Sequence, residues 1–172
     1  MTLLLRFSGL IDRLNTLVGR VVIWAVLAVT LVSSGNAIVR YVFNASSNGW
    51  LEIQWYLFSA VFLLCAGYTL LANEHVRIDV VSGRFSRRTQ AWIDLIGGVF
   101  FLLPMTVLIL WLSVPTAWNT LTSGEMSSDA GGLIRWPAKM MIPLGFALLS
   151  LQGVSEIIKR AAFLTGRDGS HD

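Results

Sequence analysis

Charged residues are scarce in this 172-residue chain: they make up 13% of it, against 55% hydrophobic residues. A soluble domain usually carries about 25% charged residues. The mean hydropathy is correspondingly high, at +0.67. The composition therefore indicates a membrane protein, whose length is taken up by membrane spans and short loops.

Cysteine and histidine are almost absent. The single cysteine, Cys65, excludes a disulfide framework and a CxxC metal site within the chain, and we interpret it as a packing residue. The two histidines, His75 and His171, lie outside the apolar stretches, so the chain lacks histidine pairs that could hold haem between helices. The HExxH zinc motif and the P-loop motif are also missing. We therefore expect no enzyme activity, no catalytic residue, no cofactor and no metal site.

Acidic residues are missing from the middle of the apolar stretches. Glu52, Asp94 and Glu156 all lie near the ends of such stretches. A proton-coupled exporter needs a carboxylate deep within a span, and an inverted-repeat transporter needs an internal repeat, which we do not find. The chain therefore lacks the groups to carry an ion or a polar solute by itself, which favours a scaffold or accessory subunit of a larger complex.

Long apolar runs predict an all-α integral membrane protein with four transmembrane helices. The clearest run, from Ile53 to Leu71, has no charged residue over about 19 positions, close to the number that a helix needs to cross the hydrocarbon core. We predict a single membrane domain over residues 1–172. Its predicted spans are about 18–39, 53–72, 92–116 and 137–158.

The segments around these spans also carry signals. Residues 1–17 are predicted to form an amphipathic interfacial helix. The prediction rests on one shared helical face, made by Leu3, Phe7, Leu10, Leu14 and Leu17. Pro104 is expected to kink the third span. Residues 165–172 are polar and are predicted to form a flexible tail.

Basic residues give the chain a net charge of +3, but they lie at span ends rather than in one patch, so nucleic acid is not an expected partner. Ten of the 13 lie in the N-terminal segment, between the second and third spans, or after the fourth span. The others are Arg40, Arg135 and Lys139. The positive-inside rule therefore predicts that both termini are cytoplasmic.

Charged residues near the span ends suggest ion pairs. Arg40 and Glu52 flank the same short turn and are predicted to pair across it, because partial desolvation at the interface strengthens attraction. Glu156 and Arg160 are four residues apart on one helix and can pair as well.

Small and polar residues within the spans suggest close helix contacts. Ser33, Asn36 and Arg40 share a helical face, which we interpret as interhelical packing in preference to a ligand site. Several glycines are expected to form notches for docking a larger bundle. They are Gly35, Gly67, Gly97, Gly98 and Gly145.

The loop after the second span carries an alternating pattern. His75, Arg77 and Asp79 alternate with Val76 and Ile78, so they would point to one side of an extended segment. We expect this segment to be ordered and to contact a partner or the bundle. Contact with lipid headgroups is the alternative.

An ordered series of motifs covers nearly the whole chain. It comprises Arg40-Tyr41-Val42-Phe43-Asn44, Ser46, Trp50, Glu52, His75-Val76-Arg77-Ile78-Asp79 and Ile142-Pro143-Leu144-Gly145. In this order and spacing the chain resembles the small permease subunit of TRAP (tripartite ATP-independent periplasmic) transporters. The family often has a second acid after the position of Glu52, where this chain has Ile53.

The resemblance implies a multi-pass subunit of the bacterial inner membrane. Its partners would be a large permease subunit, a soluble periplasmic substrate-binding protein and membrane lipids, in a system that takes up solutes, commonly organic acids, with a sodium gradient. The residues expected to make structural or partner contacts are Arg40, Tyr41, Asn44, Trp50, Glu52, His75, Arg77, Asp79 and Pro143. The alternatives are an anchor subunit of a redox or signalling complex and a self-sufficient small transporter acting as an oligomer.

Overall fold

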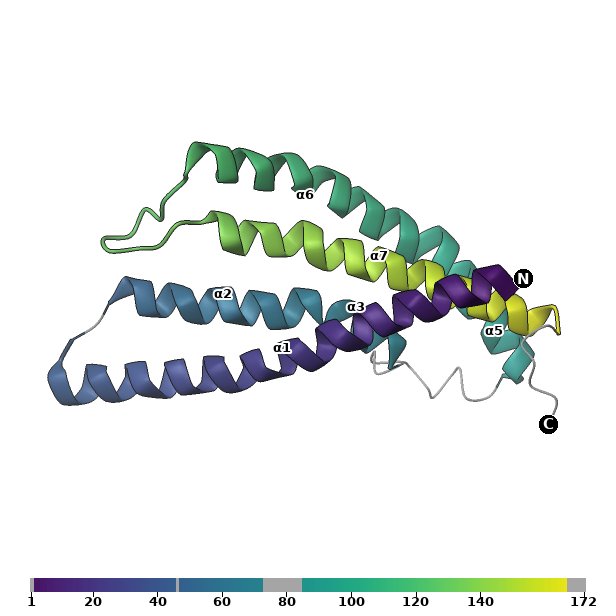
Figure 1. Cartoon of the computed structure of the whole chain (residues 1–172), viewed down its shortest axis with the longest axis horizontal. Coiled ribbons are helices and arrows are strands. Elements are labelled where there is room, and N and C mark those ends of the chain that lie inside the picture. Colours follow the sequence, from purple (N-terminus) through teal and green to yellow (C-terminus); the bar gives the residue numbers. More distant parts are fainter. Residues whose placement is uncertain (1, 46, 73–84, 167–172) are drawn as a thin grey trace.

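The structure, a computed structural model, describes residues 2–45, 47–72 and 85–166 (Figure 1). Most of these residues form helices. The elements are α1 (Thr2–Phe43), α2 (Asn48–Leu64), α3 (Ala66–Leu71), α5 (Arg87–Gly97), the π-helical turn η1 (Gly98–Leu102), α6 (Leu103–Ser123) and α7 (Trp136–Leu164). They make four helical runs that are long and apolar enough to cross a membrane. The predicted all-α fold with four spans is confirmed.

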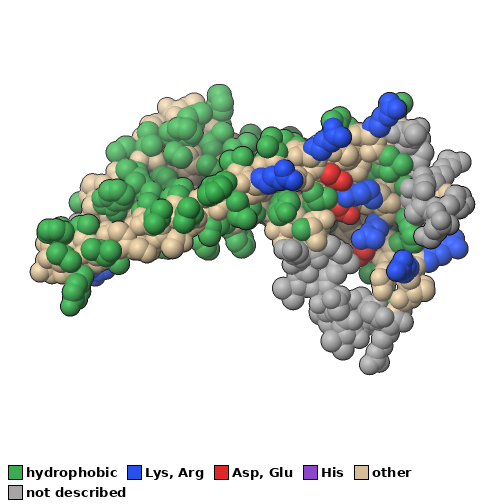
Figure 2. All heavy atoms as spheres, turned by 60° about the horizontal axis from the view of Figure 1, so that its bottom comes forward, with side chains coloured by type: hydrophobic (Ala, Val, Ile, Leu, Met, Phe, Trp, Pro, Cys, Tyr) green, Lys and Arg blue, Asp and Glu red, His purple; other side chains and the backbone are tan. Residues whose placement is uncertain are grey.

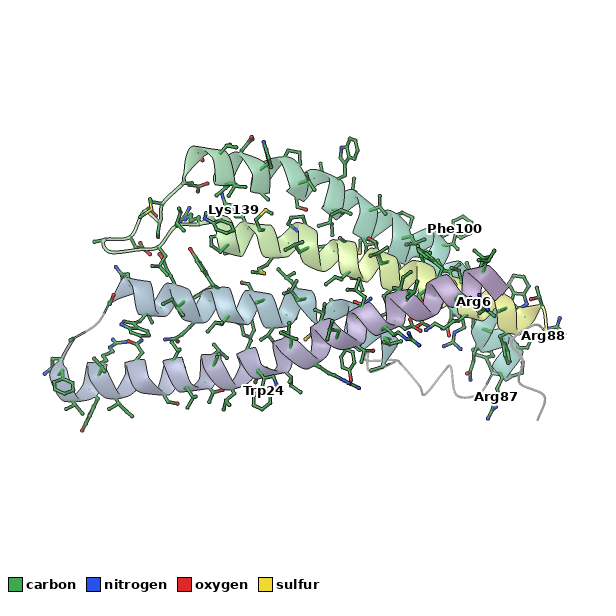
Figure 3. All side chains as sticks on the ribbon, viewed as in Figure 1. Arg6, Trp24, Arg87, Arg88, Phe100 and Lys139 are labelled. Carbon is green, nitrogen blue, oxygen red and sulfur yellow. The ribbon has the colours of Figure 1, made fainter. Side chains whose placement is uncertain are left out.

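Helix α7 is the centre of the bundle, because it contacts α1, α2, α3, α5, η1 and α6. Helix α1 begins, and α7 ends, at the same end of the molecule as α5 (Figure 1). We call this the basic end, since it carries Arg6, Arg87 and Arg88 (Figure 3). The turn between α1 and α2 and the loop between α6 and α7 lie at the opposite end, which we call the loop end.

The outer surface is largely apolar. Figure 2 shows hydrophobic side chains over the half of this face that lies toward the loop end, while Lys and Arg side chains gather toward the basic end. Trp24 and Phe100 point away from the bundle and are 70% and 69% exposed (Figure 3). Such a surface suits contact with acyl chains or with another membrane protein.

Helix α1 runs from Thr2 to Phe43 without a break near residue 17, so a separate amphipathic N-terminal helix is not confirmed. The predicted apolar face is on the outside: Leu3 and Leu10 are 80% and 62% exposed. The side of α1 that packs inward carries Ser8, Ile11, Asn15, Gly19 and Val22. Polar contacts with α7, described below, make the first turns of α1 part of the bundle. Their placement in the membrane interface stays a prediction.

The third helical run departs from α geometry just before Pro104. At η1 the backbone N–H of Leu103 donates to the carbonyl of Gly98, five residues earlier. Pro104 follows at the start of α6. Because proline has no N–H to donate and its ring crowds the preceding turn, a π-helical turn at this point relieves the clash. A π-helical turn thus lies directly before Pro104, and the kink expected at this proline stays a prediction.

Glycines bring the helices of this chain close to one another. A Cβ atom at Gly145 would lie 2.6 Å from the Leu63 carbonyl oxygen, and one at Gly67 would lie 2.2 Å from Oδ1 of Asn15. Gly98 faces Ile157 in the same way, whereas Gly35 and Gly97 have nothing within 4 Å of such an atom. Gly67, Gly98 and Gly145 therefore serve contacts within the chain, and the prediction of notches for a partner applies only to Gly35 and Gly97.

Candidate subunit interface

A polar network joins α1 to α7 on the basic-end side of the bundle. Asn15 and Gln152 are fully buried, and the Asn15 amide nitrogen donates to Oε1 of Gln152 at 2.9 Å. Gln152 donates in turn to Oδ1 of Asp12 at 2.9 Å and to Glu156 at 3.1 Å. Hydrogen bonds between membrane helices contribute on average about 0.6 kcal/mol each. Because Asn15 and Gln152 are buried and bond to each other, the network fixes the register of α1 against α7 and does not form an open site.

The same network continues with hydroxyl groups and a lysine. Ser155 donates to Oδ1 of Asp12 at 2.7 Å and lies 2.7 Å from the Ser8 hydroxyl. Lys159 pairs with Asp12 at 3.2 Å and also with Glu156. One lysine is thus shared by two carboxylates of the same chain. We did not predict contacts for Ser8, Asp12 or Asn15, although these residues recur every three or four positions on α1, as the polar residues Gln152, Ser155 and Lys159 do on α7.

The predicted pair between Glu156 and Arg160 is wrong. Arg160 instead forms an ion pair with Asp94 of α5 at 3.3 Å, while Glu156 pairs with Lys159. Glu156 therefore pairs with a residue three positions along its own helix, whereas Arg160 pairs with a residue of another helix. The Arg160–Asp94 pair ties α5 to the end of α7.

Side chains of α2 hold the loop between α6 and α7. Asn48, Glu52 and Tyr56 lie one turn apart on one face of α2. Asn48 donates to the Ala130 carbonyl at 3.0 Å, and Tyr56 donates to the Ile134 carbonyl at 3.0 Å. Between them, Oε2 of Glu52 accepts the backbone N–H of Leu133 at 2.6 Å. This face of α2 therefore clamps the loop end of the bundle.

A cleft of about 490 Å³ lies beside this clamp. Its lining includes Glu52, Tyr56, Asp129, Arg135 and Lys139. Lys139 stands at the start of α7 (Figure 3). The cleft is open and carries charges of both signs, which suits a polar contact with another protein better than a small apolar ligand.

Glu125 closes the loop onto α7. Its carboxylate pairs with Lys139 at 2.6 Å and Arg135 at 3.3 Å, and Thr120 donates to it at 3.1 Å. The hydrogen bond from Lys139 is the main reason that the pKa of Glu125 lies below its ordinary value of 4.5. Glu125 is therefore ionised at neutral pH, and its pairing stabilises the loop.

The Glu125 pairing predicts a specific acid response. A carboxylate with a lowered pKa contributes stability that is complete above its unfolded pKa and is lost as the pH falls through the lowered pKa. Thermal unfolding of the purified protein should therefore show this contribution in full well above the ordinary pKa of 4.5 and losing strength as the pH falls below that value. Glu125→Gln should remove that part of the acid response, whereas Asp129→Asn, at an exposed acid of the same loop, should keep it. An unchanged acid response in Glu125→Gln would contradict the pairing.

The predicted pair between Arg40 and Glu52 is also wrong. No ion pair joins these two described residues, because Glu52 is bonded to the Leu133 backbone instead. Arg40 lines a polar groove of about 660 Å³ between α1 and α2, which we call the Arg40 groove. The polar residues of its lining are Ser33, Asn36, Arg40, Tyr41, Asn44 and Gln54. Ser33, Asn36 and Arg40 thus share a face, as the spacing indicated.

The other predicted contact residues lie in different places. Tyr41 and Trp50 are 88% and 52% exposed at the loop end, while Pro143 is buried inside α7. Asn44 ends α1 with a φ of 49°, a left-handed conformation that asparagine tolerates better than most residues. The expectation for His75, Arg77 and Asp79 lies outside the described residues.

A comparison with known families decides the identity of this four-helix protein. The model of the DctQ component of tripartite ATP-independent periplasmic transporters matches residues 29–163. The chain belongs to this family. No curated protein and no solved structure gives a significant match.

Membership of the DctQ family makes the chain the small membrane subunit of a TRAP transporter, as the resemblance of its motifs implied. The match runs from the second half of α1 to the end of α7, so it includes the Arg40 groove and the clamp on α2. Its α1 segment before residue 29, with Asp12 and Asn15, lies outside the match. The family assigns this DctQ chain to a transport system rather than to a redox or signalling complex.

The described part of this DctQ chain offers few ligands for an ion. No group of three His, Cys, Asp or Glu residues within it lies close enough together to hold a metal. Cys65 is free and half-buried between α2 and α3. Several of the chain's charged groups instead serve helix and loop contacts, notably in the network around Gln152 and the cluster around Glu125.

Proposed function

We propose that this DctQ subunit is a non-catalytic scaffold for the large permease subunit of a sodium-driven TRAP transporter that takes up an organic acid with a periplasmic binding protein. The observation that carries the proposal is the match to the DctQ family. The distribution of polar groups supports it. Most of those between α1 and α7 bond to each other, and the outer surface is mainly apolar.

The proposed division of labour follows from the chemistry of solute transport. A sodium site needs several converging oxygen atoms, and an acidic solute needs fixed donors near the middle of the membrane. The large subunit would supply both, while this chain would provide a fixed frame beside it. The packing of its helices suits this role, because α7 contacts α1, α2 and α6.

Co-purification tests the proposed function. When the whole transport system is expressed with a tag on this chain, the large permease subunit should be recovered with it in detergent. A tagged, unrelated membrane protein of four spans is the control. If the large subunit stays in the unbound fraction while this chain is recovered intact, the scaffold proposal is wrong.

The proposal places the chain in the bacterial inner membrane with both termini in the cytoplasm. Because Lys and Arg gather at the basic end, the positive-inside rule puts that end in the cytoplasm and the loop end in the periplasm. Alkaline phosphatase fused after Asp172 should therefore be inactive, and the same reporter inserted between residues 123 and 132 should be active. The opposite pattern would invert the topology.

A further inference from the structure

The first turns of α1 repeat a short pattern that the family match, which begins at residue 29, does not include. A leucine is followed three residues later by an arginine, and the pair recurs every seven residues, at Leu3 and Arg6, Leu10 and Arg13, and Leu17 and Arg20. A period of seven returns to nearly the same side of an α-helix, with a drift of about 20° per repeat. We call Arg6, Arg13 and Arg20 the arginine row. The leucines of the repeat, with Phe7 and Leu14 between them, form the apolar stripe.

Contacts with α7 fix the direction in which both sets of side chains point. Asn15 bonds to Gln152, and Asp12 pairs with Lys159. The opposite sides of α1 are therefore turned outward: the apolar stripe is 42% to 80% exposed, and the arginine row is exposed as well. At 100° per residue, the row lies about 80° around the helix from the stripe. The two thus run side by side along the outer surface of the bundle.

The arginine row has no acidic partner within the described part of the chain. None of its three guanidinium groups forms an ion pair or a hydrogen bond there. Asp12 is the only acid in residues 1–43, and it pairs with Lys159. A second copy of α1 would bring the same three positive charges, so it does not complement the row. The row instead offers cations, about 10 Å apart along the helix, to anionic groups outside the chain.

The length of α1 brings the row to the level of the lipid headgroups. Its 42 residues would extend about 63 Å, whereas a bilayer with its headgroups is about 40 to 45 Å thick. Tyr41 is 88% exposed at the loop end, where aromatic residues mark one interface. The far edge of the hydrocarbon core then lies about 20 residues earlier, so Arg20 stands at the other interface. The exposed apolar stripe continues past that level and avoids water only when this segment leans along the interface, as amphipathic helices do.

We infer that the first turns of α1 form a docking surface for anionic phospholipids, whose phosphate groups bind the arginine row and whose acyl chains lie on the apolar stripe. In the proposed topology these are lipids of the cytoplasmic leaflet. An anionic phospholipid complements both features at once, because its phosphate and its acyl chains meet at the interface, as the row and the stripe do. Since Asn15 and Asp12 join this segment to α7, the bound lipid also sets the depth of the basic end in the membrane. A helix of another subunit is the alternative occupant.

Photo-crosslinking in the intact complex tests the occupant. Leu10 is 62% exposed on the apolar stripe, and Arg6 and Arg13 are its neighbours on the helix surface. The complex carrying p-benzoylphenylalanine at Leu10 is placed in nanodiscs with equal parts of phosphatidylglycerol and phosphatidylcholine. Mass spectrometry should find lipid adducts, with phosphatidylglycerol favoured about threefold or more. The same probe at Leu31, 63% exposed on α1 and away from the arginine row, should show no such preference. An adduct of the Leu10 probe with another subunit, or equal adducts with the two lipids, overturns the inference.

Charge changes test the arginine row. Arg6→Gln combined with Arg13→Gln should abolish the preference of the Leu10 probe for phosphatidylglycerol. Arg87→Gln combined with Arg88→Gln is the matched control, because it removes two exposed charges from α5 at the same basic end (Figure 3) and should keep the preference. Arg6→Lys with Arg13→Lys should also keep it, since lysine binds phosphate as a point charge. Equal losses in the two glutamine variants would indicate general attraction to the basic end and would overturn the inference. If the large subunit is not recovered with this chain, the proposed function fails, and the same lipid test then applies to the chain alone.

Discussion

Cells that carry the other components of the TRAP system but lack this chain are expected to take up the solute no faster than cells without the system. The large permease subunit would lose the helices that brace it. The periplasmic binding protein would then deliver the solute to an incomplete membrane complex. Uptake of radiolabelled solute in a deletion strain measures this. Re-expression of the chain from a plasmid should restore the rate, and an immunoblot should follow the amount of the large subunit.

Two further measurements separate a scaffold from a solute carrier. Gln152→Ala should lower assembly or rate without changing the ranking of competing solutes, because the Gln152 side chain bonds to Asn15 and Asp12 of α1 rather than to the solute. The chain reconstituted alone in liposomes with a sodium gradient should move no solute. Sodium-dependent uptake of an organic acid by this chain alone would instead favour a self-sufficient oligomeric transporter.

Gly145→Ala is expected to destabilise the bundle by about 1 to 3 kcal/mol, which is the usual cost of overpacking a close contact. The added Cβ would lie 2.6 Å from the Leu63 carbonyl oxygen and 2.8 Å from the Leu63 Cβ atom. A backbone oxygen cannot rotate away, so α2 and α7 would have to separate. The higher helix propensity of alanine offsets only about 1 kcal/mol of this cost.

Gly97→Ala is the matched control, because nothing lies within 4 Å of a Cβ atom at that position. Its stability should be unchanged or slightly higher, since alanine is favoured over glycine within a helix. Denaturant titration of the purified proteins in detergent, followed by tryptophan fluorescence, measures both variants. Equal destabilisation by the two substitutions would show that the contact between Gly145 and Leu63 is not the cause.

The hydropathy of the chain determined its class and its four helical runs. An apolar stretch of about 20 residues in a membrane must satisfy its own backbone hydrogen bonds, and a helix does so. The order of short motifs around Arg40, Glu52 and Pro143 was enough to indicate the family. The helices are longer than the predicted spans at several ends. Helical turns that extend past the apolar spans, such as the start of α1, are stabilised by contacts with other helices. Local hydropathy does not predict these contacts.

The two predicted ion pairs were wrong because the actual partners lie on other parts of the fold. Arg40 and Glu52 are close in sequence, yet Glu52 bonds to Leu133, which lies far along the chain in the loop between α6 and α7. Arg160 likewise pairs with Asp94 on α5 and not with Glu156 on the same helix. A charged side chain can reach several partners, and the choice depends on which helix the fold places beside it.

The sequence by itself determined that this is a four-helix membrane subunit of the DctQ family, since composition, span length and motif order act locally along the chain. Only the tertiary structure decided what lies inside it. The Asn15–Gln152–Asp12 network, the clamp of α2 on the loop and the close contact at Gly145 each join residues that are far apart in sequence. They depend on how the helices pack, because in a membrane both the inner and outer faces of a helix can be apolar and the hydrophobic pattern does not distinguish them.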